Sequence, residues 1–144
     1  MVRYCLNFLV GSTLYPLVEL LWRGRTHSSM ALAGGLCFVL IDIVCCQKLH
    51  KKSLAAKCTA GSLLITSVEF LIGIWVNTLM KLDVWDYSAL PLNIFGQICL
   101  PFSLIWFVLT IPACLICNTC GHIAERLIES SNTDDSPDVV TVQN

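Results

Sequence analysis

Four long apolar stretches leave this sequence few possible folds. They run approximately over residues 4–22, 30–47, 59–80 and 97–117. Each is close in length to the roughly 17–25 residues that a helix needs to cross a hydrocarbon core about 30 Å thick. None of them alternates apolar with polar side chains, as the strands of a membrane barrel do. The sequence therefore predicts an all-α membrane fold with four transmembrane helices in a single domain over residues 1–120.

Composition and the start of the chain agree with this prediction. Only 13% of the 144 residues are charged and 56% are hydrophobic, whereas a soluble domain is about 25% charged. The first apolar stretch differs from a secretory signal, because it contains Pro16 and Glu19 and no small-x-small cleavage site precedes Arg23. We expect this stretch to remain in the mature protein as the first helix.

The distribution of lysine and arginine predicts the orientation. With four crossings, both termini and the middle loop share one side of the membrane. That side carries Arg3, Lys48, Lys51, Lys52, Lys57 and Arg126, and the other carries Arg23, Arg25 and Lys81. Because positively charged loops stay in the cytoplasm, we expect cytoplasmic termini and outward-facing loops at residues 23–29 and 81–96. The lysines of loop 48–57 suit anionic lipid headgroups.

The C-terminal residues differ in composition from the rest. Residues 125–144 show no sustained apolar period and carry Asp134, Asp135 and Asp138. Such a segment buries too little surface to offset the entropy of ordering. We expect residues 121–144 to form a polar, disordered cytoplasmic tail, with a docking motif for a partner as the alternative.

An internal similarity suggests a repeat. The segment GSTLYPLVELL (11–21) aligns with GSLLITSVEFL (61–71), including a shared Val-Glu that places Glu19 over Glu69. Gly-Gly-Leu-Cys (34–37) and Gly-Gln-Ile-Cys (96–99) then open the second and fourth predicted helices. We therefore expect two tandem helical hairpins related by an axis along the membrane normal. Chance similarity between apolar helices is the alternative.

The acid at position 69 needs a polar environment. An acid at the centre of a membrane helix costs about 2.5–3.5 kcal/mol on insertion scales, so it should face protein or water. Helical spacing places it on a polar stripe consisting of Ser62, Thr66, Glu69, Gly73 and Asn77. The first helix has a matching stripe consisting of Ser12, Pro16, Glu19 and Arg23. Since polar and small residues mediate helix contacts in lipid, we expect the two stripes to meet.

The two glutamates differ in their local neighbours. Glu19 has Arg23 one turn later, in the favoured order for a structural ion pair. Glu69 has no such neighbour, so its partner would be Arg23 or Arg25 from another helix, or it would stay uncharged. Arginine side chains near a helix end extend toward water, and desolvation disfavours a charge. We therefore expect a neutral Glu69 at pH 7, bonded to Ser12, Thr66 or water.

Function is most readily assigned to these polar groups. A buried membrane acid is by default a candidate for proton or cation coupling, and Asp42, nearer the cytoplasmic end, is a weaker one. In the outer loops, Arg23, Arg25 and Asp86 could line a pocket for a polar solute. The alternative is an aromatic belt with a fixed turn at Asp86. The candidate transport or binding residues are Glu19, Glu69, Arg23, Arg25, Asn77 and Asp86.

Two segments carry a family resemblance. WRGRTHSSMALAGGLCF (22–38) and SVEFLIGIWVNTLMKLDVWDYSALPLNIFGQICLPFSLIWFVL (67–109) resemble the bacterial membrane-protein family called putative ABC-transporter type IV, or CmpB-like. The resemblance spans roughly residues 11–112, and its most specific part is WDYS…LPLN…GQICLPFS. It implies a small integral protein of the bacterial plasma membrane, nominally a permease component. It supplies no functional residues.

Several other functions find no support in the sequence. There is no GxxxxGK[ST] motif, so an ATPase would be a separate chain, and no GxSxG or HExxH motif, so we expect no enzyme. The run Cys114-x-x-Cys117-x-x-Cys120-Gly-His122 places its thiols along one helix face without the paired turns of zinc sites. We therefore expect no metal or cofactor, although juxtamembrane cysteines could be acylated. A net charge of −1 disfavours nucleic acid.

Two functional hypotheses follow. In the first, the protein is a permease-like subunit or small carrier for an unidentified solute, with Glu19 and Glu69 at the repeat interface. Because four helices make a thin path, a homo- or hetero-oligomer is expected. In the second, it is a non-transporting membrane scaffold or regulatory subunit, in which the polar stripes only hold helices together.

Overall fold

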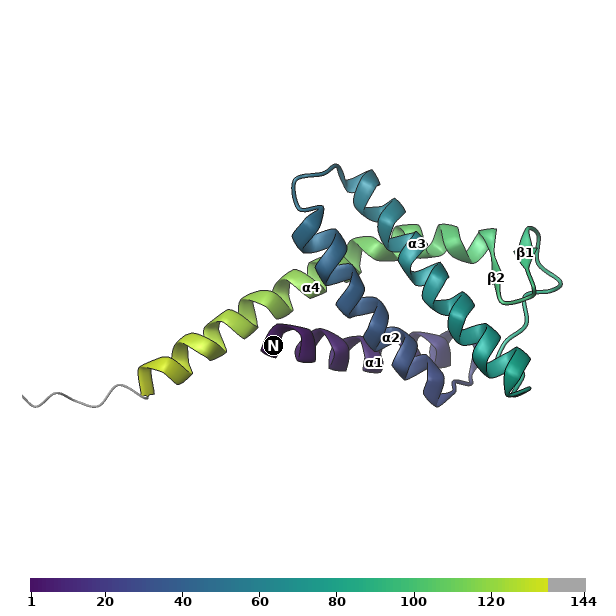
Figure 1. The fold of residues 1–144 in the computed structure, drawn as a ribbon, viewed down its shortest axis with the longest axis horizontal. Helices are drawn as coiled ribbons and strands as arrows, with labels where there is room; N and C mark the ends of the chain where they lie inside the picture. The colour runs from purple at the N-terminus through teal and green to yellow at the C-terminus, as the bar shows by residue number, and fades with distance from the viewer. Residues whose placement is uncertain (135–144) are drawn as a thin grey trace, which may run out of the picture.

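The structure, a computed structural model, describes residues 1–134 and is built almost entirely from helices (Figure 1). The helical elements are α1 (Val2–Arg23), α2 (Ser28–Ile41) continued by the π-helix η1 (Asp42–Lys48), α3 (Leu54–Gly73) continued by the π-helix η2 (Ile74–Leu79), and α4 (Leu100–Asp134). Within the described residues, four helical segments are long and apolar enough to cross a membrane. The prediction of an all-α membrane fold with four such helices is therefore confirmed.

Local signals explain where the first loops begin and end. Gly24, in the left-handed conformation with φ 70°, ends α1 and donates its backbone N–H to Leu20. Glycine adopts this conformation without the steric cost that a side chain would add. The next helix, α2, begins after His27, whose Nδ1 accepts the backbone N–H of Ser29 at 3.2 Å. Ser53 caps α3 in the same way through the N–H of Ala56.

Small residues bring α1 and α2 into close contact. A Cβ atom on Gly11 would collide with the backbone of Gly34, and a Cβ atom on Gly34 would collide with the backbone of Gly11. Beside this crossing, Gly35 lies against Ser12 and Phe8. In lipid, close backbone approach of this kind supplies the van der Waals contact that holds helices together.

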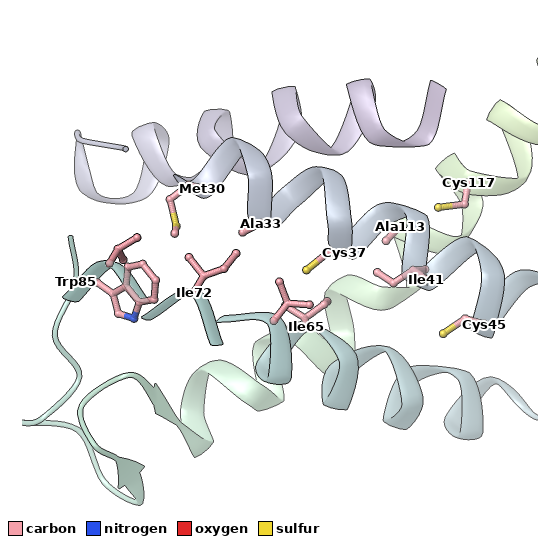
Figure 2. Packing of buried hydrophobic residues seen from close by; sticks show 12 residues of the cluster. Met30, Ala33, Cys37, Ile41, Cys45, Ile65, Ile72, Trp85, Ala113 and Cys117 are labelled. Atoms are coloured by element: carbon pink, nitrogen blue, oxygen red, sulfur yellow. The ribbon is translucent and has the colours of Figure 1, made fainter. Parts of the chain in front are cut away.

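The core lies around α2. Half of the α2–η1 span is buried, compared with 11% of the α1 span. Figure 2 shows Met30, Ala33, Cys37 and Ile41 of α2 facing residues of α3 and α4, with Trp85 of the outer loop at one end of the cluster. The outermost helix, α1, leaves most of its apolar side chains facing outward, as a lipid-exposed helix should.

The loop between η2 and α4 (residues 80–99) is folded rather than extended. It is called the outer loop because its residues 81–96 are predicted to face outward. Two short strands, β1 (Asn93–Ile94) and β2 (Ile98–Cys99), pair antiparallel within it. Upstream of them, Trp85 is only 5% exposed and donates its Nε1–H to the backbone oxygen of Gln97 at 2.9 Å. The loop therefore closes one end of the helix bundle, with Trp85 as part of the main core.

The boundaries of α4 differ from those expected. The helix begins at Leu100 instead of residue 97, because Gly96 takes a positive φ of 66° and β2 follows it. It also continues past residue 117 to Asp134, so residues 121–134 of the predicted tail are helical. Extending an existing helix avoids the cost of nucleation, which explains why polar residues can follow an apolar span without a break. Residues 135–144 lie outside the described residues, and their disorder stays a prediction.

The structure does not confirm the two-hairpin repeat. Gly34 lies inside α2, which begins at Ser28, so the prediction that it opens the second helix is wrong. Gly96, its proposed equivalent, lies in the loop before α4. The acids also differ in position, since Glu19 lies one turn before the last residue of α1, whereas Glu69 lies about three turns before the end of η2.

Candidate functional site

Glu69 lies where three helices meet. Its side chain projects from α3 and the residue is 3% exposed. The phenolic hydroxyl of Tyr15, on α1, donates a hydrogen bond to Oε1. The indole N–H of Trp106, on α4, donates another to Oε2 at 2.8 Å. Each carboxyl oxygen therefore has its own donor, and each donor comes from a different helix.

The two donors support each other. The rings of Tyr15 and Trp106 are stacked, with centroids 5.6 Å apart and planes inclined by 29°. Both rings also pack against the buried core. Because burial disfavours a charged carboxyl while the two donors favour it, opposing effects act on the proton of Glu69. A group in this balance is suited to taking up and releasing a proton.

The two hydroxyl side chains expected to bond to Glu69, those of Ser12 and Thr66, do not bond to it. Thr66 bonds instead to the hydroxyl of Ser103 at 3.1 Å, and within residues 1–134 the buried Ser12 hydroxyl has no hydrogen-bond partner. Arg23 bonds to other groups. The physical reason is the direction of the α3 stripe, whose Ser62 and Thr66 both bond to Ser103 of α4. The predicted meeting of the α1 and α3 stripes is therefore incorrect at these positions.

The polar residues of α1 have a different register from the one predicted. They form a line consisting of Arg3, Asn7, Gly11, Tyr15, Glu19 and Arg23, spaced four residues apart. Because each interval turns about 40° past a full turn, the line winds around α1 instead of keeping to one face. This line extends over the full length of α1, roughly 30 Å at 1.5 Å per residue, which matches the thickness of a hydrocarbon core. It makes contacts through Arg3 at its N-terminal end, which is predicted to be cytoplasmic and is called the inner end, and through Tyr15 at its middle. At its C-terminal end, called the outer end, it makes contacts through Glu19 and Arg23.

The outer end of the line is an ion pair, as predicted. Arg23 pairs with Glu19 one turn earlier and donates a second hydrogen bond to the backbone oxygen of Val84 at 3.2 Å. The hydroxyl of Thr26 donates to the other oxygen of Glu19 at 2.5 Å. In the part of the chain that the structure describes, the buried Nε of Arg23 has no partner. The ion pair thus joins α1 to the outer loop and retains one free donor.

A small pocket lies beside this ion pair. It has a volume of about 170 Å³ and is lined by Arg23, Arg25, Thr26, His27, Leu82, Asp83 and Val84. The pocket therefore contains both predicted arginines, but its acid is Asp83 instead of the predicted Asp86. Asp83 and Lys81 both adopt positive φ values, 47° and 56°. Positive φ is uncommon in residues other than glycine and is found at functional sites.

Asp86 and Asn77 hold the outer loop together. One oxygen of Asp86 accepts the backbone N–H of Ser88 and the other accepts its hydroxyl, both at 2.8 Å. These two donors hold the pKa of the exposed Asp86 carboxyl below its usual range. Asn77 donates to the backbone oxygen of Trp85 at 3.0 Å and accepts the N–H of Val84 at 2.7 Å. Both residues therefore have the structural role that the alternative hypothesis assigned to the turn at Asp86.

A buried ion pair at the inner end escaped the sequence analysis. Arg3 donates through Nε and Nη2 to the two oxygens of Asp42, at 2.8 and 2.5 Å, and Asp42 is fully buried. Gln47 adds a third hydrogen bond to this carboxylate at 3.0 Å. The sequence feature that could have revealed this pair was the predicted hairpin of the first two helices. In such a hairpin the start of α1 and the end of α2 must lie side by side. Arg3 was instead counted only as a cytoplasmic charge.

The cysteines show no disulfide or metal arrangement in the described residues. All nine are free thiols, and no group of three or more cysteine, histidine or acidic side chains within residues 1–134 is placed to hold a metal ion. Cys45 and Cys117 form part of the buried core.

Comparison with known proteins gives one match. A family model described as "Putative ABC-transporter type IV" matches residues 6–134, which is most of the chain. No curated protein and no solved structure matches it.

Proposed function

Because this chain belongs to the family described as putative ABC-transporter type IV, we propose that it is a permease-like subunit or small carrier in which Glu69 couples solute movement to a proton. The observation that supports this role is the Tyr15–Glu69–Trp106 contact, which presents one buried carboxyl to donors from two other helices. Intramembrane acids facing the interior of a bundle commonly serve proton or cation coupling.

The position of Glu69 supports the same role. It lies near the middle of the α3–η2 span, between the polar contacts at the inner and outer ends of the bundle. A change in its protonation would alter its bonds to α1 and α4 together. Protonation of Glu69 would therefore be coupled to the positions of α1 and α4 relative to α3.

The pocket at the outer end is the proposed entry for the solute. Arg25 and Asp83 offer opposite charges there, and Arg23 has a free Nε donor. Charge-assisted hydrogen bonds from such groups would select a polar solute. We further propose a non-enzymatic role in the bacterial plasma membrane, with cytoplasmic termini, an oligomeric assembly and a separate ATPase subunit.

One observation favours the scaffold hypothesis instead. Every polar residue of the α3 stripe has a hydrogen-bond partner in the described residues, and Glu69 does not line the pocket beside Arg23. In a scaffold, this network would only hold the helices together. The two hypotheses differ in what the isosteric substitution Glu69→Gln should do.

The test uses the full chain reconstituted in liposomes that enclose a pH-sensitive dye. Under an imposed membrane potential, the wild type should carry protons, and Glu69→Gln should fall to the rate of protein-free vesicles while still inserting. Ser67→Ala, on the exposed side of α3, is the matched control and should keep the wild-type rate. A wild-type proton flux that exceeds that of protein-free vesicles and that Glu69→Gln leaves unchanged would exclude coupling at this residue.

A further inference from the structure

We propose that the segment Leu92–Phe95 of the outer-loop hairpin, which consists of β1 with one residue on each side and is called the tip, inserts into the outer leaflet of the membrane and contacts lipid acyl chains. Three of its four side chains are apolar and exposed, and the fourth, Asn93, bonds within the loop. Leu92 is 74% exposed, Ile94 is 50% exposed and Phe95 is 79% exposed. The sequence alone placed these residues in a water-facing loop.

The hairpin folds back along α3 instead of extending beyond it. The ring of Phe95 lies 6.4 Å from the ring of Phe70, which precedes the end of η2 by nine residues, roughly 13 Å of helix. Nearby, the side chain of Gln97 accepts a hydrogen bond from Asn77 at 2.8 Å. Figure 1 accordingly shows β1 and β2 beside the start of α4, away from the end of α3.

Backbone N–H and C=O groups in and around the hairpin form hydrogen bonds within the loop, as a segment in contact with lipid requires. Tyr87 donates its N–H to Gly96, Leu90 donates to Tyr87, and Gln97 donates to Ile94. The side chain of Asn93 supplies further bonds, donating to Ser88 and Leu90 and accepting the N–H of Gly96. These bonds pair backbone groups around the tip within the loop itself.

Charge and surroundings are consistent with lipid as the partner. No Asp, Glu, Lys or Arg stands between Asp86 and Glu125, so the tip carries no charge to desolvate. The outer part of the α3–η2 span presents further exposed apolar side chains, with Leu71 at 68%, Trp75 at 48% and Leu79 at 71%. Tryptophan at such a position is typical of the membrane interface. The hairpin thus continues an apolar surface that already faces acyl chains.

The backbone offers a second, independent argument. Leu92 and Phe95 both adopt left-handed conformations, with φ values of 52° and 51°. Residues with large side chains pay a steric cost there that glycine or asparagine avoids. Burial within the protein does not offset this strain, because both side chains are more than 70% exposed. Transfer of these side chains from water into lipid would offset it.

The experiment places a dansyl-bearing side chain at Phe95, and separately at Leu92, in the full chain reconstituted in phosphatidylcholine liposomes. Quenching is measured with lipids brominated on their acyl chains and with iodide on both sides of the membrane. A probe at Leu63, 63% exposed on α3, provides the lipid reference, and a probe at Ser53, in the inner loop, provides the aqueous reference.

Insertion predicts that probes at both tip positions are quenched by brominated lipid as strongly as the Leu63 probe and are protected from iodide. Quenching by iodide at the level of the Ser53 probe would overturn the proposal. Protection from both quenchers, together with energy transfer between labelled copies, would also overturn it and assign the tip to a contact with a second copy. Two probe positions keep the test valid if one substitution prevents folding.

Discussion

Tyr15 on α1 donates its phenolic hydrogen to Glu69 on α3, although α1 packs mainly against α2 and α3 mainly against α4. This bond therefore joins α1 to α3, two helices that otherwise make little direct contact with each other. The stacking of Tyr15 on Trp106 extends the connection to α4. The position of the Glu69 carboxyl thus depends on how the two pairs are assembled.

Removing this bond should loosen the assembly of the helix pairs. We expect Tyr15→Phe to lower the free energy of unfolding in detergent by about 1 kcal/mol, the scale of interhelical hydrogen bonds in membrane proteins. Tyr4→Phe is the matched control, because Tyr4 is 40% exposed and lies 3.5 Å from Gln47. An equal loss in both variants would contradict a special role for the Tyr15–Glu69 bond.

The protonation of Glu69 can be observed directly. We expect the resting protein at pH 7 to hold a neutral Glu69, because the residue is 3% exposed and no cationic side chain bonds to it in the described residues. Infrared difference spectra of the wild type against Glu69→Gln should show a protonated-carboxyl band that the variant lacks. A carboxylate band at neutral pH would show instead that the two donors stabilise the charged form.

Removing one partner of the buried Arg3–Asp42 ion pair should destabilise the protein more than replacing both partners together. Removing one partner of a buried ion pair costs about 3–5 kcal/mol, and we expect Arg3→Met to fall near the lower end because Arg3 is 29% exposed. The double variant Arg3→Met, Asp42→Leu should recover part of this loss, since it leaves no unpaired buried charge. Equilibrium unfolding of Arg3→Met, Asp42→Leu and the double variant, each compared with the wild type, gives the coupling energy.

The exposed pair of His122 and Glu125 is the control for this cycle. Its atoms are 3.5 Å apart, and its side chains are 78% and 66% exposed. Glu125→Gln should change stability by less than about 1 kcal/mol, as exposed pairs do. Additive effects of the Arg3 and Asp42 substitutions would mean that the two residues do not act together.

Asp86 should titrate below an ordinary aspartate. Its folded-state pKa is depressed by the two donors of Ser88, so the associated stability is present above the unfolded-state value of about 3.9 and is lost as the pH falls through the folded-state pKa. Carbon-13 chemical shifts of the labelled carboxyl should show a midpoint below 3.9. Ser88→Ala should raise it, whereas Ser28→Ala should not; a midpoint unchanged by Ser88→Ala would contradict this account.

The membrane orientation can be tested in the two loops that flank the α3–η2 span. A maleimide that cannot cross membranes should label Ser88→Cys from outside intact cells and Ser53→Cys only after the cytoplasmic side is opened. The reason is the excess of lysine and arginine on the side that carries the middle loop. The opposite labelling pattern would show that the predicted orientation is inverted. The unmodified chain is the control for labelling of the natural cysteines.

Several features of this protein follow from the sequence alone, because they depend on local properties. Apolar length is a sum over neighbouring residues, so the existence of the four spans was predictable, although the polar continuation of α4 from residue 117 to Asp134 was not. The pairing of Glu19 with Arg23 was also predictable, since residues four apart on one helix are always close together.

Only the tertiary structure decided the partners of Glu69 and Asp42 and the course of the outer loop. In an almost wholly apolar helix, many faces are equally suitable for packing, so periodicity does not show which face meets which helix. Tyr15 and Trp106 therefore resemble ordinary apolar positions until α1 and α4 are placed around α3. The return of Phe95 to Phe70 likewise depends on a turn through Gly96 that joins residues far apart in the chain.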